Sequence, residues 1–185
     1  MPAPVVLISG CSSGIGRALA DAFMAAGYSV WAGARKAADL EYLSAAGFTA
    51  VALDVNDATA IELAAERINR EAGRLDILIN NAGYGGIGPL LDGGVEAMRQ
   101  QFETNVYSLV GVTHACFALL RASKGLVVNI GSVSGVMTTP FAGAYCASKA
   151  AVHSLTDALR MELAPFSIEV MEVQPGAIES NFGAN

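Results

Sequence analysis

Short runs of continuously apolar residues alternate along this chain with longer stretches in which apolar residues recur every three or four positions. The short runs are typical of buried β-strands, and the longer stretches are typical of amphipathic α-helices. The pattern predicts strands over residues 5–9, 28–34, 49–55, 75–83, 125–132 and 168–176. It predicts helices over residues 16–27, 36–47, 58–73, about 95–121 and about 144–164.

Several residues at the edges of these stretches support the predicted helix ends. Gly27 and Gly47 stand where the first two helices are expected to end, since glycine readily adopts the left-handed conformation that closes a helix. Asp57 precedes the third helix, where its carboxylate can accept hydrogen bonds from the free N–H groups of the first turn. Pro165 follows the last predicted helix and is expected to end it.

Strands that are apolar throughout and alternate with helices indicate a parallel sheet covered on both faces. Right-handed crossovers between such strands produce a doubly wound, Rossmann-like sheet in three layers, α/β/α. No linker, charge run or low-complexity segment interrupts the pattern, so residues 1–185 are predicted to form a single domain. Ligands of such sheets bind at the carboxyl ends of the strands, where the unusual residues of this chain fall.

Composition narrows the classes of function. The formal net charge of −6 argues against a nucleic-acid-binding or anionic-membrane surface. The three cysteines form no Cys-x-x-Cys pair, which is typical of a reducing compartment. His114 and His153 are not spaced as metal ligands, and the first apolar run is too short for a signal peptide or membrane span. We therefore expect a cytoplasmic protein with no bound metal.

The segment SGCSSGIG (9–16) joins the first predicted strand to the first helix. Its glycines allow a tight turn and a close approach of pyrophosphate to the backbone, next to the positive end of the helix dipole. Their spacing is GxxxGxG and not the GxGxxG of the usual dinucleotide fingerprint, so the turn alone is a weak signal. The candidate cofactor-binding residues of this turn are Gly10, Ser12, Ser13, Gly14, Ile15 and Gly16.

Tyr145 and Lys149 are four residues apart at the start of the last predicted helix, and they share one helix face. The phenol and the ammonium group can therefore point into one site. Taken alone, the pair is more simply explained by a half-buried core aromatic at Tyr145 and a solvated surface charge at Lys149.

The ordered motifs of the chain resemble those of the short-chain dehydrogenase/reductase family. They are the GxxxGxG turn, NNAG (80–83) after the fourth strand, Ser132 after the fifth, Tyr-x-x-x-Lys (145–149), and Pro-Gly (175–176) after the sixth. The resemblance covers essentially the whole chain. The segments CSSGIG, GPL and YCASK are most similar to the branch that contains 17β-hydroxysteroid dehydrogenases, retinol dehydrogenases and acyl-dihydroxyacetone-phosphate reductase.

The resemblance implies an oxidoreductase that binds a nicotinamide dinucleotide. In many such sheets an acidic residue at the end of the second strand bonds the ribose 2′-hydroxyl, but this end reads WAGARK (31–36), with Ala34 at that position. Arg35 follows and can bind a 2′-phosphate through charge-assisted hydrogen bonds, so NADP(H) is expected over NAD(H). The alternative is that Arg35 is only a solvated side chain at the end of the strand and binds no phosphate. By resemblance, the other cofactor-binding residues are Asp54, Asn81, Gly83, Tyr145, Lys149, Pro175, Gly176, Ile178 and Ser180.

Catalytic roles are also implied by the resemblance. Tyr145 would be the acid in carbonyl reduction and the base in alcohol oxidation, and Ser132 would hold the substrate oxygen. Lys149 would assist Tyr145 and reach the nicotinamide ribose, while Asn105 would fix a water or backbone link that relays protons toward Lys149. A tyrosine has a pKa of about 10, so action as a base near pH 7 requires about 4 kcal/mol. An ammonium about 4 Å away supplies on the order of 4 kcal/mol at an effective dielectric constant of about 20.

The residues expected to form the substrate wall are mostly apolar and predict a hydrophobic ketone, aldehyde or alcohol, such as a steroid, retinoid, acyl or aromatic compound. The alternative is that these loops only pack on each other. They are Tyr84, Ile87, Val133, Met137, Pro140 and Phe141.

The helix predicted over about 95–121 is apolar on more than one side, which predicts a homodimer or homotetramer. Members of the resembled family continue past the sixth strand through a substrate-covering segment to a seventh strand. This chain stops at Asn185, so a sheet without that strand and without the substrate lid is expected.

Two other functions remain open. A non-catalytic dinucleotide-binding sensor or scaffold would keep the glycine turn without needing Ser132, Tyr145 and Lys149. A flavin or methyl-donor protein on a similar sheet would also explain the turn, but it would not explain those three residues.

Overall fold

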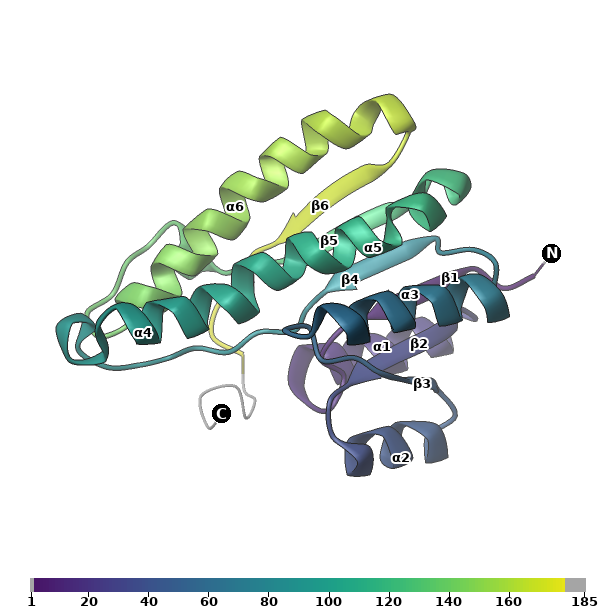
Figure 1. The fold of residues 1–185 in the computed structure, drawn as a ribbon, viewed down its shortest axis with the longest axis horizontal. Helices are drawn as coiled ribbons and strands as arrows, with labels where there is room; N and C mark the ends of the chain where they lie inside the picture. The colour runs from purple at the N-terminus through teal and green to yellow at the C-terminus, as the bar shows by residue number, and fades with distance from the viewer. Residues whose placement is uncertain (1, 179–185) are drawn as a thin grey trace.

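The computed structural model describes residues 2–178 and contains one sheet of six parallel strands in the order β3-β2-β1-β4-β5-β6. This arrangement confirms the predicted Rossmann-like sheet (Figure 1). The strands are β1 (Val5–Ile8), β2 (Ser29–Ala34), β3 (Thr49–Ala52), β4 (Ile77–Asn80), β5 (Leu126–Ile130) and β6 (Glu169–Val173). The α-helices are α1 (Gly14–Ala25), α2 (Ala37–Ala45), α3 (Ala58–Glu71), α4 (Leu90–Phe102), α5 (Ser108–Ser123) and α6 (Gly143–Leu163).

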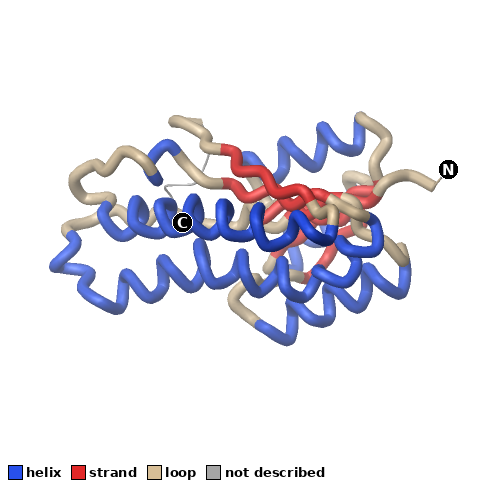
Figure 2. Tube along the Cα trace, turned by 90° about the horizontal axis from the view of Figure 1, so that it is seen from above, coloured by secondary structure: helices blue, strands red, loops and turns tan. Residues whose placement is uncertain are grey.

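Helices cover the sheet on both sides (Figure 2). Two hydrophobic clusters of the core lie between the sheet and these helices. The packing of strand β1 explains why its sequence is continuously apolar. Val5 and Leu7 pack into the cluster beneath α3 and α5, whereas Val6 and Ile8 pack into the cluster beneath α1 and α2. Alternate residues of a strand point to opposite faces, so a central strand of a three-layer sheet must be apolar at every position.

The predicted helix ends are present in the structure. Asp57 caps α3, since its Oδ1 accepts hydrogen bonds from the backbone N–H groups of Thr59 (2.9 Å) and Ala60 (3.3 Å). Gly27 and Gly47 follow α1 and α2 with φ of 84° and 93°, a conformation that favours glycine.

The helix predicted over about 95–121 is longer and less regular than the sequence pattern indicated. It begins at Leu90, is kinked at Gly94 (φ 57°, ψ −155°), and passes through a π-helical turn, η1 (Glu103–Tyr107), between α4 and α5. The sequence pattern did not predict the first turn of α4, because the glycine pair at 93–94 is unfavourable within a helix. The π-helical turn adds a residue to the spiral and turns Asn105 and Val106 inward, where both are buried.

Among the described residues, the helical stretch Leu90–Ser123 is the one segment long and apolar enough to cross a membrane. One side of this stretch has partners in the fold: Leu109 packs with α6, and Val112, Cys116 and Leu120 pack in the cluster against the sheet. Other apolar side chains of the stretch, among them Leu91 and Val95, are exposed.

The Asp57 cap yields a test of the fold. Replacement of Asp57 by alanine removes both capping bonds of α3 and is expected to lower the free energy of unfolding by about 1 kcal/mol. Asn is as good a cap as Asp, so Asp57→Asn is expected to keep most of this stability. Urea denaturation of the two variants and the unmodified protein measures the difference, and equal stability of the alanine and asparagine variants would contradict the assigned cap.

Candidate functional site

A cleft with a volume of about 420 Å³ runs along the carboxyl ends of the strands. Residues that follow five strands line it: Gly10 after β1, Arg35 after β2, Asp54 after β3, Asn81 after β4 and Ser132 after β5. Parallel strands end at the same edge of a sheet, so these segments meet although they are far apart in the sequence.

The glycine turn between β1 and α1 forms the middle of the cleft. Gly10 and Gly14 have φ of 75° and 58°, and Ser12, Ser13, Gly14 and Ile15 line the cavity with Gly10. Ser13 is the N-cap residue of α1, and its side chain makes no capping bond. The first N–H groups of α1 have no partner within the helix, so this turn is suited to an anion.

Gly16 belongs beneath this turn and not in it. The sequence predicted Gly16 as a cofactor-binding residue, but it is not among the residues that line the cleft. A Cβ atom at this position would lie 2.3 Å from the Gly10 carbonyl oxygen and 2.4 Å from Asn81 Nδ2. Gly16 therefore allows α1 to pack close to the ends of β1 and β4, and it shapes the site indirectly.

Asn81 and Ser9 join the glycine turn to the segment after β4. Asn81 Nδ2 donates to the backbone oxygens of Ser9 (2.8 Å) and Gly10 (3.1 Å). The hydroxyl oxygen of Ser9, which sequence reasoning missed, accepts from the N–H groups of Asn81 and Ala82, both at 3.0 Å. These bonds end the predicted fourth strand at Asn80 and leave Asn81 and Gly83 in the cleft wall.

One end of the cleft carries both basic and acidic groups. Arg35 and Lys36 line this end and are exposed, and Asp54 lies beside them with Oδ1 accepting from the N–H of Asn56 (3.0 Å). Asp39, in the first turn of α2, lines the same end and was missed from the sequence. Its place could have been inferred, because the first turn of a helix that follows β2 faces the same edge of the sheet.

The other end of the cleft brings together Ser132, Tyr145 and Lys149. Ser132 is buried at the end of β5 and caps the short 3₁₀ turn η2 (Val133–Gly135), with its Oγ accepting from the N–H of Ser134 at 3.1 Å. Tyr145 and Lys149 come from the first two turns of α6, and Lys149 Nζ lies 6.0 Å from the centroid of the Tyr145 ring. The predicted hydroxyl, phenol and amine therefore share one cavity.

Lys149 is 5% exposed, and its Nζ donates to the carbonyl oxygen of Ile130 at 2.7 Å. Burial lowers its pKa to about 8, against the opposing effect of the negative charge of Glu172. The approach of α6 to η2 depends on Gly135, where a Cβ atom would lie 2.9 Å from the Lys149 backbone oxygen.

Asn105, predicted as catalytic, is buried in η1 and is not among the residues that line the cleft. Its Oδ1 accepts from the N–H of Tyr84 (3.1 Å), and its Nδ2 donates to the Tyr84 carbonyl oxygen (3.0 Å) and to Ser148 Oγ (3.1 Å). Ser148 in turn donates to the carbonyl oxygen of Tyr145 at 2.7 Å. These contacts tie the loop after β4 to the start of α6, and the proton relay through Asn105 stays a prediction.

The segment after β6 closes the cleft. Pro175, Gly176 and Ile178 line it, and the Pro175 carbonyl oxygen accepts from the N–H of Val133 at 3.1 Å. Ser180, the last predicted cofactor-binding residue, lies outside the described residues.

The predicted substrate wall is formed by two loops that lie side by side. The N–H of Gly88, in the loop after β4, donates to the carbonyl oxygen of Phe141, in the segment between Ser132 and Tyr145, at 2.7 Å. Tyr84 lines the cleft itself, whereas Ile87, Val133, Met137, Pro140 and Phe141 are exposed and are not among the residues that line it. A substrate wall formed by these side chains stays a prediction.

The comparisons with known proteins agree with this geometry. The family described as short chain dehydrogenase matches residues 4–185. The NADPH-dependent 3-dehydrocapnine reductase of Ornithobacterium rhinotracheale is 39% identical over 184 residues, which are 94% of this chain and 65% of that protein. The 3-ketodihydrosphingosine reductase of Bacteroides thetaiotaomicron is 36% identical over 100% of this chain and 68% of that protein. The chain thus spans about two thirds of the length of the curated relatives it matches.

Solved structures give the same result. A short-chain dehydrogenase from Streptomyces avermitilis superposes with a TM-score of 0.92 at 39% identity, over 99% of this chain and 69% of that one. A short chain dehydrogenase from Burkholderia cenocepacia in complex with NADP superposes with a TM-score of 0.89 at 29% identity, over 97% and 75%. With its parallel sheet, its cleft and these relatives, the chain belongs to the short-chain dehydrogenase/reductase family of oxidoreductases.

Proposed function

We propose that this chain binds NADP(H) in the cleft and transfers a hydride between that cofactor and a hydrophobic carbonyl or alcohol, with Tyr145 as the acid or base. One observation carries the proposal: Ser132, Tyr145 and Lys149 line the end of a cleft whose middle is a glycine turn at a helix N-terminus. A sensor or scaffold protein has no need to hold these three side chains in one cavity.

The residues of the cleft fit NADP(H) in three places. The turn from Gly10 to Ile15 offers backbone N–H groups at the positive end of α1 to a pyrophosphate. Arg35 and Lys36 offer positive charge to a 2′-phosphate, while Asp39 at the same end opposes it. Asp54 also lines this end, so charge count alone does not decide, and the choice of NADP(H) is supported by the name of the NADPH-dependent relative and by the NADP bound to a structural neighbour.

When bound, the cofactor supplies or accepts the hydride at its nicotinamide ring. During carbonyl reduction, Tyr145 donates its phenolic proton to the substrate oxygen, and during alcohol oxidation it takes that proton back. Ser132 Oγ accepts a hydrogen bond from Ser134 N–H, and its hydroxyl proton remains available to donate to the substrate oxygen. The Lys149 ammonium, 6.0 Å from the Tyr145 ring centroid, stabilises negative charge that develops on the phenol.

The loop after β4 and the segment between Ser132 and Tyr145 support an apolar substrate. Ile87, Met137 and Phe141 are each more than half exposed and lie on the two loops joined by the Gly88–Phe141 hydrogen bond. Exposed apolar side chains grouped beside a polar reaction site are typical of a binding surface for an apolar ligand.

Cofactor choice is tested by charge reversal at Arg35. Loss of a charge-assisted bond to the 2′-phosphate is expected to lower kcat/KM for NADPH by about 10- to 100-fold and to change kcat/KM for NADH much less. Arg70→Asp is the matched control, because Arg70 is an exposed arginine on α3 that is paired with Glu71. A wild-type protein that prefers NADH, or an Arg35→Asp variant with unchanged NADPH kinetics, would contradict the assignment.

The acid–base role is tested by Tyr145→Phe, which removes one oxygen atom and leaves the ring. NADPH oxidation with a panel of hydrophobic ketones and aldehydes is expected to fall by at least about 100-fold, while the dissociation constant of NADPH changes only a few-fold. Tyr42→Phe, on an exposed tyrosine of α2 that does not line the cleft, is the control. If NADPH binds but no carbonyl in the panel is reduced by the unmodified protein, the sensor or scaffold function is favoured instead.

We also propose a homodimer or homotetramer formed through the outer side of α4 and α5. The inner side of α5 packs on the sheet, but Val95, Tyr107 and Val110 remain exposed. Light scattering at micromolar concentration is expected to give at least twice the chain mass, and Val110→Glu is expected to weaken the assembly. A monomer at that concentration would exclude this interface.

A further inference from the structure

Glu172 is a nearly buried acid that the chemistry above does not use. It lies on β6, opposite Asn129 of β5 in the register, and its side chain is 7% exposed beneath α6. A carboxylate in such a place must be compensated by hydrogen bonds or by a nearby positive charge.

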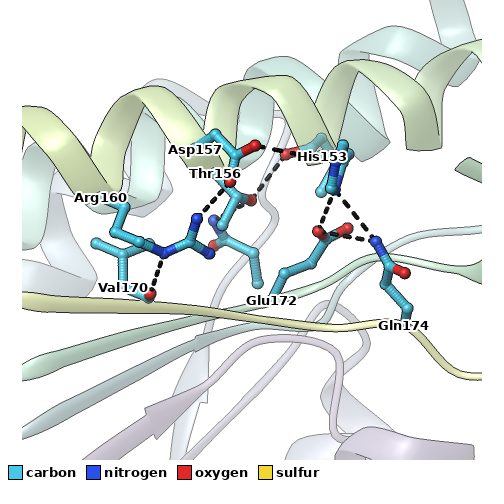
Figure 3. Close-up of polar contacts among 9 residues, drawn as sticks. His153, Thr156, Asp157, Arg160, Val170, Glu172 and Gln174 are labelled. Atoms are coloured by element: carbon cyan, nitrogen blue, oxygen red, sulfur yellow. Dashed lines mark hydrogen bonds and ion pairs between the residues drawn. The ribbon is translucent and has the colours of Figure 1, made fainter.

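One oxygen of Glu172 is held by polar side chains of α6 and of the residue that follows β6 (Figure 3). The Nδ1 atom of His153 contacts Oε2 at 2.6 Å, and Gln174 Nε2 donates to the same oxygen at 3.0 Å. His153 is half exposed, and its Nε2 lies 3.9 Å from Asp157 Oδ2. Asp157 itself is paired with Arg160 (Figure 3). The half-exposed His153 therefore connects the Glu172 carboxylate to the solvent.

The other oxygen of Glu172 points away from this cluster. Oε1 is buried and has no hydrogen-bond partner within residues 2–178. It occupies the space that a side chain at residue 131 would fill, since a Cβ atom on Gly131 would lie 2.1 Å from it. The carboxylate thus packs on the segment from Ile130 to Ser132, at the end of the cleft where Tyr145 lies.

Lys149 is bound to the same segment. Its Nζ donates to the Ile130 carbonyl oxygen, and it precedes His153 by one helical turn on α6. A neutral carbonyl satisfies one N–H of an ammonium group but does not balance its charge, and burial of that charge without a counter-charge is costly. Glu172 is the acid whose charge acts on Lys149, in the direction that keeps the amine protonated.

We infer that Glu172 is the buried counter-charge that keeps Lys149 protonated, and that His153 links this carboxylate to solvent. Glu172 acts through Lys149 and is a positioning residue. The charge coupling itself is independent of the proposed function, and only its consequence for Tyr145 rests on that function.

The pH dependence follows from the titratable and charged groups around Glu172 and Lys149. They are Tyr145, His153, Asp157 and Arg160, all on α6. The hydrogen bond and charge of Glu172 raise the pKa of His153. Below that pKa the imidazolium compensates Glu172, and above it the full carboxylate charge acts on Lys149. Removal of the Glu172 charge leaves burial unopposed, so the pKa of Lys149 must fall below its value of about 8.

The chain is well suited to a direct measurement because it contains three lysines: Lys36, Lys124 and Lys149. Lys36 and Lys124 are exposed and serve as internal references, and Lys149→Arg assigns the third signal. The protein is labelled with ¹³C-lysine, and the Cε signals are followed by NMR from pH 6 to 11, without cofactor or substrate.

Glu172→Gln keeps the size of the side chain and removes its charge. It is expected to lower the titration midpoint of Lys149 by on the order of one pH unit, and to leave those of Lys36 and Lys124 unchanged. Glu169→Gln is the matched control, since Glu169 is an exposed acid on the same strand. His153→Gln removes the imidazolium that competes with Lys149 for the charge of Glu172, so it is expected not to lower the Lys149 midpoint.

An unchanged Lys149 midpoint in a folded Glu172→Gln protein overturns the inference, as does an equal decrease in the Glu169→Gln control. If Glu172→Gln does not fold, the pair Glu172→Asp and Glu172→Asn gives the same comparison at equal size. In that pair the aspartate variant must have the higher Lys149 midpoint, and equal midpoints overturn the inference.

Activity then separates this inference from the proposed function. The alkaline limb of the kcat profile for carbonyl reduction is expected to move with the NMR midpoint. A shifted midpoint in a protein that reduces no carbonyl supports the counter-charge and contradicts the proposed function. A Tyr145-dependent activity with an unshifted Lys149 midpoint supports the proposed function and contradicts the counter-charge.

Discussion

The buried ammonium group of Lys149 connects the parts of this site that come from different regions of the chain. Its hydrogen bond to the carbonyl oxygen of Ile130 fastens α6 to the end of β5, so Tyr145 and Ser132 are held at one end of the cleft. Burial and the charge of Glu172 act on it in opposite directions, which brings its pKa to about 8. A lysine near this value retains its charge at neutral pH and remains sensitive to its surroundings.

The parallel sheet explains why such distant residues meet. Each strand ends at the same edge, so the turns after β1, β2, β3, β4 and β5 form one continuous wall. Close packing then fixes that wall. Gly16 admits Asn81 beneath the first turn, and the π-helical turn points Asn105 at the loop after β4 and at Ser148. The glycine turn and the tyrosine–lysine pair belong to one cavity because these supporting contacts leave little freedom.

Much of the fold was predictable from the sequence. Continuously apolar strands, helix-ending glycines and the Asp57 cap are local signals, and each reports on its own segment. Tyr145, Lys149 and Ser132 were identified through spacing and resemblance. The role of Gly16 beneath the turn, the contacts of Asn105 and the presence of Asp39 in the cleft were not predictable, because they depend on which segments pack together in space. Glu172 gave no signal, since a charged residue in an edge strand is usually solvated.

The most direct test of the account is a crystal structure of the protein with NADP(H) bound. The account predicts the pyrophosphate at the turn from Gly10 to Ile15, the 2′-phosphate beside Arg35, and the nicotinamide ring next to Tyr145 and Lys149. A cofactor bound with its nicotinamide away from Tyr145, or a cleft that excludes NADP(H) at millimolar concentration, would contradict it.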